Sequence, residues 1–346
     1  MKKFGVGIIG VQSFGRTYFK EIEKLDCATV VAVCDANPEV LQRVCDEEGI
    51  AARYSDYRHM LADSAVDVVF IATPHFLHYQ MTLDALRAGK HVFCEKPLAM
   101  NTEEAQEMAR AARAAGLLLT CHYNRRQSPA VKMLKDAAGK GTFGEIYQMN
   151  VKWMARYTAF MFAANSSWRV EKKKAGGGIL IGRGSHMIDA ALSIMDMPKI
   201  KSINANISNR LTGFEVDDYA MVVLKLENGA TIHVECSYEN NIPQYEEEIE
   251  YQIFGTQAGA WHRQQDGKSQ FMMGRCAFPE NRWIDLGAEM REEDYRDAYP
   301  KSIVRDFMEA LRDGREPLIT GEDGAYITTI LDAAYKSSEQ GCEVLI

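Results

Sequence analysis

Residues 4–15 read FGVGIIGVQSFG, and this stretch decides how the first third of the chain folds. Phe4 to Ile9 form a short apolar run that is typical of a buried β-strand. Gly10 and Gly15 bracket the turn that follows, and residues 15–25 have the pattern of a helix. A strand that passes through a glycine turn into a helix predicts the start of a β-α-β unit.

The alternation of strand and helix continues to about residue 121. Residues 66–72 (VDVVFIA) are almost continuously apolar, as expected of a parallel strand that is covered on both faces. Repeated β-α-β units predict an α/β Rossmann domain with a doubly wound parallel sheet over residues 1–124. The expected strands are 4–9, 29–34, 66–72, 90–94 and 117–121, and the expected helices are 15–25, 38–48, 76–88 and 102–116.

After about residue 125 the rhythm changes, and long strands follow one another. Asn228-Gly229 lies between two of them and predicts a hairpin. We expect an α+β domain over residues 125–346, built on a mostly antiparallel open sheet, with C-terminal helices that can pack back on the first domain. Its expected strands are 145–153, 200–208, 219–226, 230–238 and 247–254, and its expected helices are 128–139, 184–195, 302–312 and 323–340.

The composition excludes several classes of partner. The chain has 346 residues, 47% of them hydrophobic, and a formal net charge of -8, which argues against nucleic acid or an anionic membrane as the main partner. The sequence contains no run of about 18 apolar residues, so we expect no membrane-spanning helix. The eight cysteines form no C-x-x-C pair, and several lie in apolar runs. They are interpreted as buried free thiols, so we expect a cytoplasmic protein.

The first turn also suggests a ligand. Dinucleotide-binding domains carry G-x-G-x-x-G at this place; Gly10 and Gly15 match its first and third glycines, and Gln12 replaces the second. Asp35 ends the second strand, where a carboxylate would bind ribose hydroxyls and repel a 2′-phosphate. The sequence therefore predicts NAD rather than NADP, unless the glycines only pack the helix on the strand. The expected contacts here are Gly10, Gln12, Ser13, Phe14, Gly15 and Asp35.

Three further segments resemble the Gfo/Idh/MocA family of oxidoreductases. They are CEKPL at 94–98, GGGILIGRGSHMID at 176–189 and PLITGEDG at 317–324, with TPHFLH at 73–78 before them. The resemblance covers nearly the whole chain. It implies a nicotinamide cofactor, a sugar or cyclitol substrate, and assembly into a homo-oligomer, either a dimer or a tetramer.

The resemblance also assigns roles to two residues. It implies that Lys96 is the active-site lysine and His186 the catalytic histidine. Oxidation of an alcohol removes a proton from oxygen, which a neutral imidazole can accept near neutral pH, and a lysine can stabilise the developing alkoxide. Both residues also allow a structural reading, as a strand-end lysine and a core histidine.

The remaining candidates line the expected cofactor and substrate sites. Thr73, Pro74, His75 and His78 follow the apolar strand 66–72, at the carboxyl edge where ligands bind in such sheets. The two histidines lack a third ligand at metal-binding spacing, so we expect no metal. The resemblance adds Glu95, Lys96, Asn124, Trp168 and Arg169 near the cofactor, and the residues expected to bind substrate are Lys96, Tyr157, Arg183 and His186.

The chain departs from the family pattern at one position. Family members commonly carry an Asp four residues before the histidine, and here that residue is Gly182. The change puts inositol-dehydrogenase-like specificity in doubt. Arg183 or Lys174 could contact the substrate instead. Asp189 could orient His186. The glycines at 176–178 are interpreted as a tight turn rather than a phosphate loop, because no P-loop Lys-Ser/Thr follows.

The leading hypothesis is an oxidoreductase that transfers a hydride between NAD and a ring hydroxyl of a sugar, glycoside or cyclitol. Two alternatives stay open. One is an NAD-dependent enzyme that cleaves glycosides by oxidation, elimination and reduction, without net redox change. The other is a non-catalytic NAD-binding regulator, suggested by Gln12 and Gly182.

Overall fold

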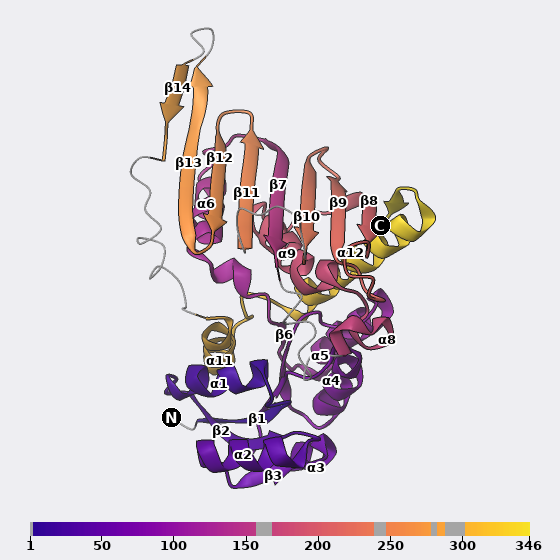
Figure 1. The fold of residues 1–346 in the computed structure, drawn as a ribbon. Coiled ribbons are helices and arrows are strands. Elements are labelled where there is room, and N and C mark those ends of the chain that lie inside the picture. Colours follow the sequence, from indigo (N-terminus) through magenta and orange to yellow (C-terminus); the bar gives the residue numbers. More distant parts are fainter. Residues whose placement is uncertain (1–2, 157–167, 239–246, 278–281, 288–301) are drawn as a thin grey trace. The chain divides into compact units, whose positions relative to one another are not determined.

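A computed structural model describes residues 3–156, 168–238, 247–277, 282–287 and 302–346 (Figure 1). The chain divides into two compact units. The first comprises Met1–Tyr123, Lys173–Ala175 and Pro300–Thr329, and the second comprises Asn124–Lys172, Gly176–Tyr299 and Ile330–Ile346.

The first unit is built on a parallel sheet of six strands. The strand order is β3-β2-β1-β4-β5-β6, so the chain reverses its direction of winding between β1 and β4. Figure 1 shows α1 and α2 on opposite sides of β1 and β2, which confirms the doubly wound α/β domain. The strands are β1 (Phe4–Ile9), β2 (Ala28–Cys34), β3 (Ala52–Tyr54), β4 (Val68–Ile71), β5 (His91–Cys94) and β6 (Leu119–Cys121), and the helices between them are α1 (Phe14–Glu23), α2 (Pro38–Glu48), α3 (Tyr57–Leu61), α4 (His78–Arg87) and α5 (Thr102–Ala115).

Aromatic rings fill the core on one side of this sheet. Phe70 of β4 and Phe93 of β5 lie on neighbouring strands with their rings stacked, 4.4 Å between centroids. Tyr18 of α1 packs edge-on against both rings, at 5.2 and 5.4 Å. All three side chains are buried. The packing fixes α1 against the strands that end at the expected ligand-binding edge.

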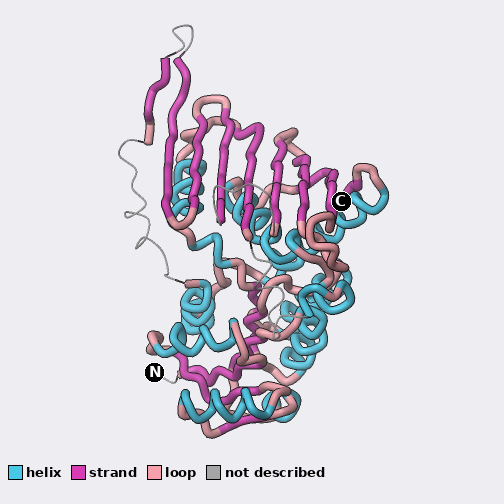
Figure 2. The backbone as a smooth tube through the Cα atoms, viewed as in Figure 1, coloured by secondary structure: helices cyan, strands magenta, loops and turns pink. Residues whose placement is uncertain are grey.

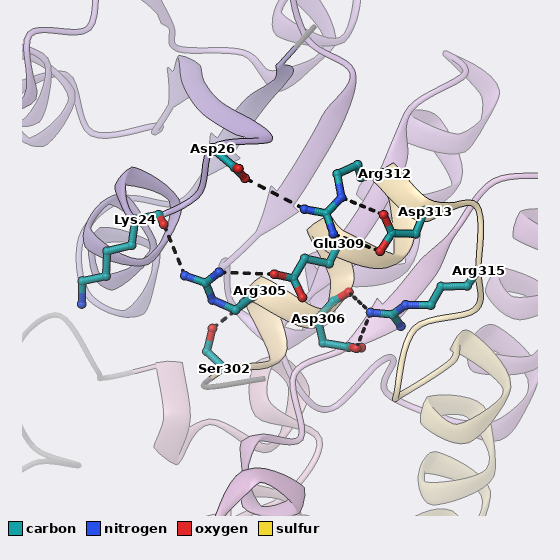
Figure 3. A network of polar contacts seen from close by, with 9 residues as sticks. All are labelled: Lys24, Asp26, Ser302, Arg305, Asp306, Glu309, Arg312, Asp313 and Arg315. Carbon is teal, nitrogen blue, oxygen red and sulfur yellow. Dashed lines mark hydrogen bonds and ion pairs between the residues drawn. The ribbon is translucent and has the colours of Figure 1, made fainter. Parts of the chain in front are cut away.

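Helix α11 (Ile303–Asp313) belongs to the first unit and is held there by polar contacts (Figure 3). At its start, Arg305 donates to the backbone oxygen of Lys24, 3.3 Å away. The buried carboxylate of Asp306 accepts hydrogen bonds from the backbone amide of Leu318 at 2.6 Å and from Arg315 at 2.9 Å. These bonds fasten the segment after the helix back onto it.

The second unit contains a nine-stranded sheet with the order β14-β13-β12-β11-β7-β10-β9-β8-β15. Figure 2 shows helices along this sheet, and α9 packs on β7 and β10 with all its residues buried. Every pair is antiparallel except β7 with β10, so the mostly antiparallel sheet is confirmed. The strands are β7 (Ile146–Ala155), β8 (Ile200–Ser208), β9 (Tyr219–Leu226), β10 (Thr231–Ser237), β11 (Glu247–Gly255), β12 (Gly259–Gln265), β13 (Lys268–Ala277), β14 (Arg282–Asp285) and β15 (Val344–Leu345), and the helices are α6 (Pro129–Gly139), α8 (Lys172–Ala175, mostly in the first unit), α9 (Ser185–Ile194) and α12 (Gly321–Gln340, shared between the units).

The five strands expected in the second unit are confirmed within about two residues, and the Asn228-Gly229 hairpin joins β9 to β10. Strands β12, β13 and β14 were not predicted. The helix expected to begin at 184 is preceded by a π-helical turn, Leu180–Gly184, which carries the chain into α9.

Two findings concern membrane-spanning helices and the cysteine side chains. No helix within the described ranges is long and apolar enough to cross a membrane. All eight cysteines are free thiols; six are buried as expected, whereas Cys276 and Cys342 are exposed. Burial, together with Asp35, raises the pKa of Cys34 to about 12, so this thiol stays protonated and unreactive at neutral pH.

We predict that Asp306→Ala lowers the free energy of unfolding by about 2–3 kcal/mol, because it removes the acceptor of two charge-assisted hydrogen bonds. Asp313→Ala is the matched control. Its carboxylate pairs with Arg312 at the surface, where such pairs contribute roughly 0–1 kcal/mol. Denaturant unfolding followed by circular dichroism checks both; equal losses in the two variants would contradict the prediction.

Candidate active site

The glycine turn after β1 is a place of close backbone approach. Gly10 has a φ of +86°, which favours glycine, and a Cβ there would lie 2.6 Å from the backbone oxygen of Ala72. A Cβ on Gly15 would lie 1.9 Å from the backbone oxygen of Gly10. The turn therefore needs both glycines, as the first and third glycines of a dinucleotide-binding turn do.

Asp35 ties this turn to the end of β2. Its buried carboxylate accepts hydrogen bonds from the backbone amides of Val11 at 3.0 Å and Asn37 at 2.9 Å. The side chain of Gln12 donates to the same group at 3.3 Å. Gln12 thus reaches the carboxylate that was expected to bind ribose. Ser13 and Phe14 start α1, and the Phe14 side chain is exposed.

The segment after β4 is held by His78. This histidine is fully buried, with Nδ1 2.8 Å from the Pro97 oxygen and Nε2 3.0 Å from the Thr73 oxygen. Burial lowers its pKa, so the ring is neutral at pH 7 and donates to one of the two oxygens. His78 therefore links the segment after β4 to the one after β5. Beside it, His75 approaches the Ala175 oxygen at 2.8 Å.

Glu95 is the centre of a buried polar cluster at the carboxyl end of β5. Its Oε1 accepts a hydrogen bond from Tyr18 of α1 and lies 2.9 Å from Nδ1 of His122. Burial by itself would raise the pKa of Glu95, but His122, Lys96 and Tyr18 favour the carboxylate and hold its pKa at about 2. The charge is therefore present throughout the neutral range, directly before Lys96.

His186 is the second residue of α9 and is 6% exposed. Its ring lies 6.1 Å from that of Trp153 on β7. Two guanidinium groups stack on the same tryptophan, Arg125 at 4.3 Å and Arg183 at 4.4 Å from the ring centroid. The tryptophan beside the histidine thus carries two arginine side chains.

The glycine run before α9 is held by Asp217. The backbone amides of Gly178 and Leu180 donate to its two oxygens at 2.6 and 2.9 Å, and the Tyr335 hydroxyl donates at 2.7 Å. A Cβ on Gly178 would lie 1.9 Å from the Asp217 backbone oxygen. Since a protein carboxylate already occupies these amides, the run is a packing turn rather than a phosphate loop, as expected. It sets where the π-helical turn and α9 begin.

The sequence suggested that Asp189 could orient His186. In the structure, however, the Asp189 carboxylate pairs with Arg126. Arg126 contacts both its oxygens at 2.8–3.0 Å, and both side chains are buried. The pair joins the short helical turn at 124–127 to α9. Arg126 is therefore a structural residue of the second unit.

The other predicted residues are spread over both units. Asn124 is exposed at the start of its helical turn, and Arg169 stacks on Trp168 at 4.5 Å. Lys96 belongs to the first unit and His186 to the second, so their cooperation stays a prediction. Tyr157 lies outside the described residues. Within the described part of the chain, no group of three or more His, Cys, Asp and Glu side chains could hold a metal ion.

Sequence reasoning missed several residues that support the site. They act through partners far away in the chain: Tyr18 and His122 on Glu95, and Asp217 and Tyr335 on the glycine run. Only Asp217 had a usable local signal, because it belongs to a pair of acidic residues, Asp217-Asp218, directly before a strand of alternating polarity.

The parallel sheet of the first unit and its glycine turn together define a dinucleotide-binding Rossmann unit. The chain combines this unit with an α+β unit. Residues 4–123 match the family described as "Oxidoreductase family, NAD-binding Rossmann fold", and residues 131–260 match the "GFO/IDH/MocA C-terminal domain". The chain belongs to the Gfo/Idh/MocA family of oxidoreductases. It is an NAD-dependent dehydrogenase.

Similar proteins include several sugar and cyclitol dehydrogenases. D-Glucoside 3-dehydrogenase of Escherichia coli is 29% identical over 91% of this chain and 89% of its own length. Myo-inositol 2-dehydrogenase of Thermotoga maritima is 25% identical over 97% and 96%. A solved structure of levoglucosan dehydrogenase with NADH and L-sorbose has a TM-score of 0.81 at 25% identity, covering 100% of this chain and 99% of that one.

We predict that Glu95→Gln destabilises the protein at pH 7 and that the difference from wild type shrinks in acid. A carboxyl whose pKa is about 2 in the folded state and near 4.5 otherwise stabilises the fold above pH 4.5, and this contribution is lost as the pH falls toward 2. Thermal midpoints from pH 7 to pH 3 check this. Glu107→Gln, at an exposed carboxylate that also accepts a tyrosine hydroxyl, is the control. A difference that stays constant with pH would refute the role of the charge.

We also predict that Arg126→Met destabilises the protein by roughly 3–5 kcal/mol, because the buried Asp189 carboxylate loses its partner. The double variant Arg126→Met/Asp189→Leu should recover most of that loss, since no uncompensated charge stays buried. Denaturant unfolding measures both. Equal stability of the single and the double variant would contradict this account of the pair.

Proposed function

We propose that this dehydrogenase oxidises a secondary hydroxyl on the ring of a sugar, glycoside or cyclitol. The observation that carries the proposal is the position of Lys96. It directly follows a buried, ionised Glu95 at the carboxyl end of β5, one strand away from the switch point between β1 and β4. Ligands of open α/β sheets bind at that edge. The named activities of the similar proteins supply the substrate class.

The residues at this edge fit NAD. Gly10 and Gly15 have the close backbone contacts that a dinucleotide-binding turn requires, and Asp35 holds a carboxylate at the end of β2. On this proposal, the amides of the turn face the pyrophosphate at the start of α1, and Asp35 recognises the ribose hydroxyls. The remaining proposed cofactor contacts are Gln12, Ser13, Phe14, Thr73, Pro74, His75, Glu95, Lys96, Asn124, Trp168 and Arg169, with His78 acting through the loops it joins.

NAD, when bound, accepts the hydride that leaves the substrate carbon. His186 takes the proton of the reacting hydroxyl on an unprotonated ring nitrogen, so the carbon–oxygen single bond becomes a carbonyl. Lys96 donates a hydrogen bond to the same oxygen and stabilises its developing negative charge. Arg183 lies in the π-helical turn before α9 and stacks on the Trp153 ring. It is proposed to contact the substrate, together with Tyr157.

We predict that His186→Ala lowers kcat by about 10²–10⁴-fold, as loss of a general base does, with NAD affinity unchanged. Lys96→Ala should lower kcat as well. His233→Ala, on β10, is the matched control and should retain activity. NADH fluorescence during turnover of glycosides, anhydrosugars and cyclitols measures all three variants. Wild-type turnover that survives in His186→Ala would refute its role.

Analysis of the sugar products, combined with NADH fluorescence, separates the alternative functions. Net NADH together with a keto-sugar supports the dehydrogenase. Release of an aglycone without net NADH would favour the glycoside-cleaving enzyme. Binding of NAD without formation of either product would favour the non-catalytic NAD-binding regulator. The homo-oligomer and the cytoplasmic location stay predictions.

We further predict that Asp35→Ala raises the ratio of NADP to NAD use at least about tenfold, because the carboxylate that repels a 2′-phosphate is removed. The affinity for NAD should also fall, since Asp35 binds the Val11 amide within the turn. Steady-state kinetics with both cofactors check this. An unchanged ratio would show that cofactor choice is made elsewhere.

A further inference from the structure

His122 lies directly after β6 and is held by the Glu95 carboxylate. Strands β5 and β6 pair up to their last residues, so Glu95 and His122 follow them side by side at the carboxyl edge of the sheet. Nδ1 of His122 lies 2.9 Å from Oε1 of Glu95 and 3.1 Å from the Tyr18 hydroxyl. The imidazole also packs on the Phe93 ring, 5.2 Å between centroids. These contacts fix the orientation of the imidazole.

The charge on Glu95 decides which ring nitrogen of His122 carries the hydrogen. Burial alone would raise the pKa of Glu95, but its polar neighbours, His122 foremost, hold that pKa at about 2. A carboxylate therefore stands beside Nδ1. Since a carboxylate only accepts hydrogen bonds, Nδ1 carries the hydrogen. In the neutral imidazole the second nitrogen, Nε2, then has no hydrogen and is an acceptor.

Nε2 is the polar atom of this ring that is open to a ligand. Within the part of the chain that the structure describes, the polar contacts of the ring are made by Nδ1. The His122 side chain is 14% exposed at the edge of the sheet, so a ligand can reach it. Because Nε2 accepts, a partner at this point has to offer an N–H or O–H group.

The strand order indicates which part of NAD lies near His122. Asp35, proposed to bind the adenosine ribose, ends β2 on one side of β1, and β4, β5 and β6 lie on the other side. A dinucleotide spans such a sheet across the switch point. On that placement its nicotinamide half extends past Lys96 toward β6, the last strand on this side. The nicotinamide ring ends the dinucleotide, and its carboxamide offers N–H donors.

Resting on the proposed placement of NAD at this edge, we infer that His122 is a cofactor-binding residue whose Nε2 accepts a hydrogen bond from the amide nitrogen of the nicotinamide carboxamide. Glu95 acts here through His122, because it fixes which ring nitrogen accepts. A carboxamide held in this way limits rotation of the nicotinamide ring about its bond to ribose. His122 thus helps to set which face of the ring presents its reacting carbon to the substrate.

The test compares three nucleotides in calorimetric titrations of the full-length, nucleotide-free protein, so that the readout is affinity rather than activity. The first is NAD⁺. The second is 3-acetylpyridine adenine dinucleotide, which has a methyl group in place of the amide nitrogen and cannot donate a hydrogen bond there. The third is ADP-ribose, which keeps both ribose units and the pyrophosphate but lacks the nicotinamide.

Two variants remove the proposed acceptor. In His122→Asn the new amide can donate to Glu95 from the position of Nδ1 but places no acceptor where Nε2 stood. His122→Phe keeps the ring volume and is the second variant, should the asparagine fold poorly. His91→Asn is the matched control, because His91 begins β5 at the opposite edge of the sheet and its Nδ1 accepts the backbone amide of Leu118 at 3.0 Å.

We expect wild type to bind NAD⁺ about 3- to 10-fold more tightly than the acetylpyridine analogue, the effect of one neutral hydrogen bond. In both His122 variants the two affinities should become nearly equal, because NAD⁺ binds less tightly. The affinity for ADP-ribose should stay constant. His91→Asn should keep the wild-type preference for NAD⁺.

Equal binding of the two dinucleotides by wild type, or a preference for NAD⁺ that persists in the His122 variants, would overturn the inference and leave the dehydrogenase intact. A matching loss of affinity for ADP-ribose in these variants would overturn it too, because the contact would then not be to the carboxamide. Asp35→Ala tests the placement of NAD separately. If this variant binds ADP-ribose as tightly as wild type, the proposed placement fails and the inference fails with it.

Discussion

The first unit depends on one close approach between backbone segments. Gly15 at the start of α1 lies against the Gly10 oxygen so tightly that no side chain fits, and this brings α1 down onto the sheet. From there Tyr18 reaches past Phe70 and Phe93 to the Glu95 carboxylate. The turn after β1 and the charge after β5, both at the carboxyl edge of the sheet, are thus linked through one helix, and Lys96 follows that charge.

The second unit repeats this arrangement with different groups. Asp217 takes the amides of the glycine run, and Gly178 allows the close contact that this requires. The start of the helix that carries His186 is fixed in consequence. In both units a buried carboxylate and a glycine without room for a side chain position the segment that leads to a proposed catalytic residue. Such sites tolerate few substitutions, although none of these supporting groups need touch the substrate.

Local signals made most of the fold predictable. Apolar runs identified the parallel strands, Ser128-Pro129 marked the start of α6, and Asn228-Gly229 marked the hairpin between β9 and β10. Strands β12 to β14 were not predicted because their sequences are largely polar. Asp266-Gly267 forms the turn between β12 and β13, and both residues have positive φ. This Asp-Gly pair could have predicted a hairpin. The parallel pairing of β7 with β10 depends on tertiary arrangement and has no local signature.

The candidate site was predictable only as far as its motifs. Gly10, Asp35, Glu95 and Lys96 stand in recognisable patterns. Their supporting partners lie in no recognisable sequence pattern. Tyr18 contacts Glu95, and Arg126 contacts Asp189, only because folding brings distant parts of the chain together. His78 shows the limit in the other direction: its place in the sequence suggested a cofactor contact, whereas its ring nitrogens face protein carbonyls.

The close approach of Tyr238 to Gly182 links two positions that lie far apart in the sequence. A Cβ at position 182 would lie 2.0 Å from the Tyr238 hydroxyl oxygen, so a side chain there requires the tyrosine ring to shift or to be replaced. The effect of a substitution at either position therefore depends on the residue that already occupies the other, and the two positions are expected to change together during evolution.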